Sequence, residues 1–101
     1  MIHVIASIQV KEGQLNAFLE IFKANVSKVL EEKGCLAYAP TVDLPTGLPP
    51  QEVNPSVVTI IEKWNSLEDL KAHLSSPHML AYREKTKALV EKMSVKILKE
   101  A

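Results

Sequence analysis

The spacing of the apolar residues changes period early in the chain, and this change most constrains the fold. In residues 2–10 every even-numbered residue is apolar, so that one face of an extended chain is apolar, as in a β-strand. From residue 14 to residue 33 the apolar residues recur at spacings of three and four, as in an amphipathic helix. Gly34 follows at a position where glycine commonly ends a helix. The sequence therefore predicts a strand followed by a long helix.

Two further strands flank a proline-rich stretch. Residues 35–42 are apolar enough for a short strand, and Pro40 favours a sheet edge or a strand end. Residues 43–55 hold four of the six prolines, which predicts a long loop that either covers a pocket mouth or only joins two strands. Residues 56–64 are rich in β-branched side chains and predict the clearest strand after the first.

The last third of the chain predicts a broken helix and a final strand. Asn65-Ser66 supply an N-cap for a helix that contains Leu70 on its core-facing side. Ser76-Pro77 restart the helix, with serine as the cap and proline at the first helical position, and it is expected to run to about residue 91. Residues 93–99 alternate again as a strand.

The predicted order is β-α-β-β-α-β, so we expect an α+β, ferredoxin-like fold with both helical layers on one face of an antiparallel sheet. No repeat or linker divides the chain, so residues 1–101 are expected to form a single domain. The 12 basic and 12 acidic residues cancel, which leaves no charge surplus to favour nucleic acid or an anionic membrane. Because no long apolar run or leader pattern is present and Cys35 stands alone, we expect a cytoplasmic protein without a disulfide framework.

The sheet face away from the helices predicts a homodimer. In the first strand this face offers His3, Ile5, Ser7 and Gln9, a mixture that is not typical of a solvated surface. The third strand is apolar on both sides, and an exposed apolar face normally marks an interaction site. A second copy packed about a two-fold axis would close the two sheets into a barrel-like core, the dimeric α/β barrel. A ligand cavity could remain between the sheets where inward positions are small or polar, such as Ser7 and Thr59.

Three side chains could bind or orient an aromatic ligand. Glu62 and Trp64 share a face of the third strand, so a carboxylate and an indole could hold an aromatic hydroxyl. The alternative is that Trp64 fills the core and Glu62 pairs with a lysine, since large aromatic side chains are mostly core residues. Tyr38, on the second strand, could donate its phenol to a ligand or simply fill the interior.

His73 is the strongest candidate for acid–base chemistry. It lies three residues after Leu70, so its imidazole can point inward as an acid, a base or a hydrogen-bond donor. The alternative is a histidine that only bonds the backbone. His78 is expected to be structural or exposed at a helix start. A metal site is not favoured, because Pro77 interrupts the helix between the two histidines and their spacing of five does not suit a helical ligand pair.

Eight residues carry a resemblance to a known family: Gly34, Cys35, Tyr38, Glu62, Trp64, His73, Ser76 and His78. With the first strand and the long helix, this pattern resembles the antibiotic-biosynthesis-monooxygenase family over nearly the whole chain. The resemblance implies a ferredoxin-like fold that dimerises through its sheets. It also implies oxidation of a quinol or phenol to a quinone without metal, flavin or haem, the bound phenolate itself reducing O₂.

Carried over to this chain, the resemblance implies that Trp64 lines the substrate cavity and that His73 is an acid, base or orienting residue. Tyr38 and Glu62 would bound the pocket. The proline-rich stretch 43–55 is longer than the corresponding connection in the family, so it could reshape the pocket entrance and the substrate class.

Three functions stay open at this point. The first is a cofactor-independent monooxygenase that acts on a small quinol or phenolic aromatic with O₂. The second is an isomerase or lyase that uses His73 on a small carbonyl compound. The third is a non-enzymatic dimeric binding or stress-associated domain. A haem-degrading role is disfavoured, since neither His73 nor His78 has an evident place as an axial ligand.

Overall fold

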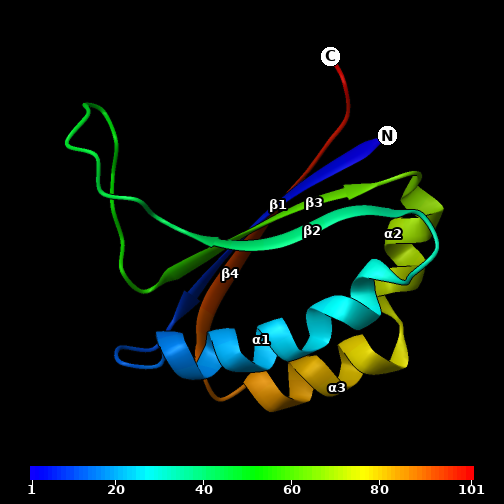
Figure 1. Ribbon diagram of the computed structural model, residues 1–101, viewed down its shortest axis with the longest axis horizontal. Coiled ribbons are helices and arrows are strands. Elements are labelled where there is room, and N and C mark those ends of the chain that lie inside the picture. Colours follow the sequence, from blue (N-terminus) through cyan, green and yellow to red (C-terminus); the bar gives the residue numbers. More distant parts are fainter.

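Four strands form one antiparallel sheet, in the order β2-β3-β1-β4, and the helices cover one of its faces (Figure 1). The computed structural model describes residues 1–101. The elements are β1 (Ile2–Val10), α1 (Leu15–Leu30), β2 (Cys35–Val42), β3 (Val57–Trp64), α2 (Leu67–Leu74), α3 (Pro77–Thr86) and β4 (Val90–Leu98). The ferredoxin-like α+β order predicted from the sequence is therefore confirmed, with the second helical layer broken into α2 and α3.

The core lies between the sheet and the helices. The alternation predicted for β1 places Val4, Ala6, Ile8 and Val10 on the helix side, where all four are buried. From α1, Phe18 and Phe22 pack onto them, since their spacing of four brings them to one helix face. None of the helices is both long and apolar enough to cross a membrane.

Strand β2 is at the sheet edge, the first of the two positions that Pro40 favoured, and the long loop after it is also confirmed. The loop, residues 43–55, extends away from the helices at the far end of the sheet (Figure 1). It is held by polar contacts of its own. The Asp43 carboxylate accepts a hydrogen bond from the Asn54 backbone N–H at 2.8 Å, and the Gln51 amide donates to the Leu44 carbonyl at 2.7 Å.

The prediction that the last helix runs to about residue 91 is wrong. Helix α3 ends at Thr86, whose hydroxyl donates to the Tyr82 carbonyl at 3.0 Å. The chain then turns through a hydrogen bond from the Leu89 N–H to the Thr86 carbonyl, and β4 begins at Val90, opposite Val10. The apolar residues Leu89 and Val90 fit the periodicity of a helix and of a strand equally well. The pairing of Val90 with Val10 of β1 places it in a strand.

The prediction that Gly34 directly follows the end of α1 is wrong. The helix ends at Leu30, and Gly34 lies four residues later with φ +79°, a conformation that favours glycine. A Cβ at this position would collide with the Asp69 carboxylate. The glycine therefore lets the first turn of α2 approach the end of the α1–β2 connection.

The sheet leaves two apolar surfaces uncovered. On the face away from the helices, Ile61 of β3 is 43% exposed and pairs with Ile5 of β1. On the helix side, Met93, Val95 and Ile97 of β4 pair with buried residues of β1, yet 47–61% of each side chain is exposed. The helices thus cover β3 and β1 but stop short of β4.

Candidate active site

A cavity of about 350 Å³ lies between the sheet and the helices and opens beside β4. Its floor is apolar, with Ala6 and Ile60 from the sheet, and its inner wall carries the rings of Phe22 and Tyr38. Only a few polar side chains reach it, among them Glu62 and His73. An apolar cavity of this size with a few converging polar groups is the usual form of a small-ligand site.

His73 is positioned as the sequence predicted. Ser66 caps α2 by accepting the Asp69 N–H at 3.1 Å, and Leu70 and His73 then face inward one turn apart. The residue His73 is 1% exposed, and its ring centroid lies 4.6 Å from that of Trp64 and 5.5 Å from that of Tyr38. The imidazole therefore forms part of the cavity wall among aromatic rings.

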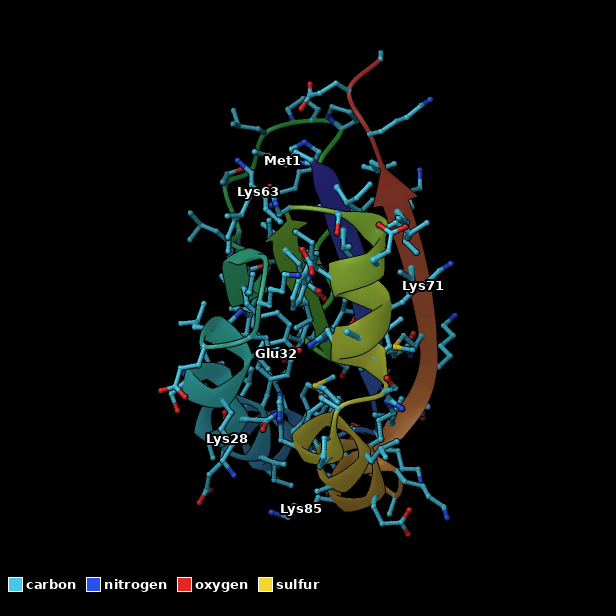
Figure 2. The ribbon with its side chains drawn as sticks, turned by 90° about the vertical axis from the view of Figure 1, so that its right-hand side faces the viewer. Met1, Lys28, Glu32, Lys63, Lys71 and Lys85 are labelled. Atoms are coloured by element: carbon cyan, nitrogen blue, oxygen red, sulfur yellow. The ribbon has the colours of Figure 1, made fainter.

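The contact that orients His73 comes from Glu32, a residue that the sequence did not single out. The helix ends before Glu32, which lies in the turn that follows, between the end of α1 and α2 (Figure 2). Its Oε2 lies 2.8 Å from His73 Nδ1 and 2.8 Å from His78 Nε2. The only sequence signal for Glu32 was its position two residues before Gly34 and beyond Val29, the last buried residue of the helix.

The hydrogen bond to Glu32 fixes the tautomer of the neutral His73 imidazole. An ionised carboxylate can only accept, so Nδ1 carries the hydrogen and Nε2 keeps a free lone pair. Burial lowers the pKa of His73, while the hydrogen bond and charge of Glu32 act in the opposite direction. His78 and Arg83 add to the lowering. His73 is thus neutral near pH 7, the state in which an imidazole can take up a proton.

Glu62 and Trp64 are hydrogen-bonded to each other, and the alternative in which Glu62 pairs with a lysine is not observed. The Trp64 Nε1–H donates to Glu62 Oε1 at 2.9 Å. Burial raises the pKa of Glu62, and the bond from Trp64 opposes this shift. Glu62 reaches the cavity, whereas Trp64 is fully buried behind the wall and supports both Glu62 and His73.

Tyr38 contributes a protonated phenol to the same cavity. It pairs with Glu62 across β2 and β3, and its ring stacks on Phe22 at a centroid distance of 5.2 Å. Burial raises the pKa of the Tyr38 phenol far above its usual value, and the nearby Glu62 charge acts in the same direction. The side chain therefore stays a hydrogen-bond donor at every pH at which the protein would be assayed.

Ser7 and Thr59 lie elsewhere. They pair with each other on the face of the sheet away from the helices, in a hollow bordered by Asp43 and Glu52 of the proline-rich loop. The predicted site residues thus divide into two groups on opposite faces. No residue of segment 43–55 lines the His73 cavity, so the loop borders the open sheet face and not that cavity's mouth.

The arrangement can perform proton transfer in an apolar space. No three His, Cys, Asp or Glu side chains are placed to hold a metal ion. One carboxyl group, one imidazole, two phenols and one guanidinium line a cavity whose other walls are mainly hydrocarbon, and the Glu32 carboxylate contacts the imidazole from outside that lining. Such surroundings strengthen charge interactions with a bound ligand and exclude water from it.

Comparison with known proteins agrees with this architecture. Residues 1–85 match the family described as antibiotic biosynthesis monooxygenase. The chain is 43% identical over 100 residues to a protein named "Probable quinol monooxygenase YgiN" from Escherichia coli K12, covering 97% of this chain and 96% of that one. A crystal structure of an antibiotic biosynthesis monooxygenase superposes with a TM-score of 0.84 at 24% identity, covering 100% of this chain and 99% of the other. A conserved protein from Methanosarcina mazei Go1 superposes with a TM-score of 0.82 at 25% identity, covering 99% and 92%.

Proposed function

The chain belongs to the antibiotic biosynthesis monooxygenase family, and from this premise we propose that it is a monooxygenase that oxidises a small quinol or phenolic aromatic with O₂. The observation that carries the proposal is His73, a neutral imidazole held by Glu32 on the wall of an apolar cavity. The name of the Escherichia coli relative supports the quinol class. The cavity volume of about 350 Å³ is sufficient for a one- or two-ring aromatic.

In the proposed reaction, His73 Nε2 takes the proton of a substrate hydroxyl. The resulting phenolate is electron-rich, and it transfers electrons to O₂ with no resident cofactor. One oxygen atom joins the ring, and the other leaves as water with the ring hydrogen and the hydroxyl hydrogen. A hydroxyarene and O₂ thus give a quinone and water. General-base transfer of this kind contributes about 10²–10⁴-fold to a rate.

The polar side chains on the wall have separate roles in this proposal. The Tyr38 phenol donates a hydrogen bond to a substrate oxygen, and Glu62 accepts one from a second hydroxyl. Trp64 acts as a positioning residue, because it holds Glu62 and contacts the His73 ring from behind. Ser7 and Thr59 line the other face, so a role for them in binding requires a second ligand or a partner subunit.

We also propose that a second copy of the chain covers the open sheet face, where Ile5 and exposed Ile61 lie side by side. A closed dimer would bury these residues as a domain core does. The mass of the protein in solution tests this point. We propose, in addition, that the protein is cytoplasmic.

Oxygen uptake tests the proposed activity. The wild-type protein, given a panel of naphthalene and benzene quinols, should consume O₂ above the rate of autoxidation. His73→Gln should lose about 10²-fold or more of that rate, because glutamine fills a similar space but cannot take up the proton. His3→Gln, which changes a histidine on the opposite face of the sheet, is the matched control. Uptake that is equal with and without protein over the panel would exclude the activity.

The same wall also suits an isomerase or lyase, because His73 and Glu62 could remove and return a proton on a carbonyl substrate. Turnover under nitrogen separates this second function from the first, since only a monooxygenase needs O₂. A pure binding domain would retain ligand affinity and show turnover in neither atmosphere.

A further inference from the structure

The second histidine at Glu32 has no role in the function proposed above. His78 Nε2 and His73 Nδ1 both lie 2.8 Å from the same oxygen, Glu32 Oε2. The carboxylate therefore joins two imidazoles, of which one lines the cavity and the other does not. Exposure increases along this chain of contacts, because the side chains of His73, Glu32 and His78 are 2%, 13% and 21% exposed.

His78 reaches solvent through a hollow of its own. This hollow, of about 180 Å³, lies between α1 and α3 and is separate from the His73 cavity. Lys28 and Lys85 border it, and both lie at the surface of the helical layer (Figure 2). His78 thus has one ring nitrogen on the partly buried Glu32 carboxylate and also lines a water-accessible hollow.

The local backbone explains why His78 is held there. Ser76 occupies the N-cap position of α3, but its hydroxyl donates to the His73 carbonyl at 2.8 Å and caps no N–H of α3. The same hydroxyl oxygen lies 3.3 Å from His78 Nε2. The turn between α2 and α3 therefore holds the two histidines at a fixed spacing around Glu32.

We propose that Glu32 couples the two imidazoles, so that His78 releases a proton to solvent when His73 takes one from the substrate. One negative charge lies between two rings that both become positive on protonation. With His73 neutral, the carboxylate neutralises a protonated His78. With His73 protonated, the carboxylate neutralises His73 instead, and protons on both rings at once would repel each other. This inference rests on the proposed function in assigning the first proton to a substrate hydroxyl.

The proton balance closes over one turnover. The substrate O–H bond breaks and a bond to His73 Nε2 forms, while His78 loses its Nδ1 proton to water. When reduced oxygen leaves as water, it takes the proton from His73 Nε2, and His78 takes one back from solvent. No proton has to cross the apolar cavity, and the charge near Glu32 stays constant. His73, whose side chain is only 2% exposed, thus takes and returns its proton without a change in the net charge of the cluster.

Other charges near His73 are too few to replace this coupling. The titratable or charged groups around its ring are Glu32 after α1, Tyr38 on β2, Glu62 on β3, and His78 and Arg83 on α3. Tyr38 does not ionise in the relevant range, since burial raises its pKa. Glu62 already accepts the Trp64 indole. Only Glu32 contacts an imidazole that also borders a solvent-accessible hollow.

The test titrates the free protein by NMR and follows turnover in the same variants. The titration midpoint of His73 should rise in His78→Ala, where a neighbouring positive charge is lost, and fall in Glu32→Gln, where the partner charge is lost. A structural role of the turn would not move the midpoint in opposite directions. Glu31→Gln, next in sequence and exposed, should leave it unchanged, and the signal of His3 is an internal reference.

Turnover supplies the second measurement. His78→Ala should lower kcat about tenfold with little change in KM, because His73, no longer opposed by the charge of His78, holds its proton more strongly and returns it to the leaving oxygen more slowly while the cavity is intact. Added imidazole should restore kcat in His78→Ala, because it can enter the hollow that the lost ring leaves open, but not in Glu32→Gln. Wild-type kcat in His78→Ala, or a His73 midpoint that His78→Ala leaves in place, would overturn the coupling. The titration needs no substrate, so failure of the wild type to consume O₂ would count against the proposed function alone.

Discussion

Replacing Trp64 by phenylalanine tests whether the buried indole holds the cavity wall in place. Trp64 is 0% exposed, and its Nε1–H donates a hydrogen bond of 2.9 Å to the buried Glu62 carboxylate. Phenylalanine removes the donor and leaves an unpaired buried acceptor, which costs about 1–3 kcal/mol. The smaller ring also loses about 1 kcal/mol of packing. We therefore expect the free energy of unfolding to fall by about 2–4 kcal/mol.

Urea unfolding followed by far-UV circular dichroism measures this loss. Fluorescence is unsuitable because Trp64 is the only tryptophan. The protein concentration must be held constant, since the stability of an oligomer depends on it. With a slope of about 1.5 kcal/mol per molar urea, the midpoint should fall by about 2 M.

A double-mutant cycle with Glu62 separates the hydrogen bond from the packing. Glu62→Leu removes the acceptor, so Trp64→Phe in that background loses only packing. The two substitutions should be non-additive by at least about 1 kcal/mol, as expected for residues in contact. Additivity within about 0.3 kcal/mol would refute the reasoning, because it would mean that the bond contributes nothing to the wall.

Three further outcomes follow from the same geometry. Burial lowers the pKa of His73 below its ordinary 6.5, and the neutral imidazole is the base. As the pH falls, kcat/KM should therefore decline with a midpoint below pH 6.5. A midpoint above pH 6.5 would contradict the assignment of His73 as the base. The unfolded chain then binds a proton that the folded chain does not, so stability should decline as pH drops below 6.5, and His73→Gln should flatten that decline in urea midpoints. Gly34→Ala should destabilise by about 2 kcal/mol or more through its positive φ and the contact with Asp69, and Asp69→Ala in the same chain should recover only the part due to the contact.

Most of the fold could be predicted because its periodic segments are long. The alternation of β1 and the helical spacing of α1 gave the correct element types, and Pro40 correctly indicated an edge strand. The end of α3 could not be predicted, because Leu89 and Val90 fit a helix and a strand equally well. Pairing between Val10 and Val90 depends on residues eighty positions apart, which a local pattern does not contain.

The candidate site was predictable only where a residue lay on a regular element. His73 follows Leu70 by one helical turn, so its inward direction could be inferred. Glu32 lies in an irregular turn after α1, and its contact with two histidines depends on how α2 and α3 pack there. Ser7 and Thr59 were expected beside a cavity between two sheets, whereas the cavity that holds His73 lies on the helix side of one sheet.

The most direct test of the central claim is the fate of isotopically heavy O₂ in the product. A quinol that the wild-type protein oxidises should yield a quinone carrying one heavy oxygen atom, and His73→Gln should form that product far more slowly. Product that contains no heavy oxygen, or labelled product formed at an equal rate by His73→Gln, would contradict a monooxygenase that uses His73 as its base.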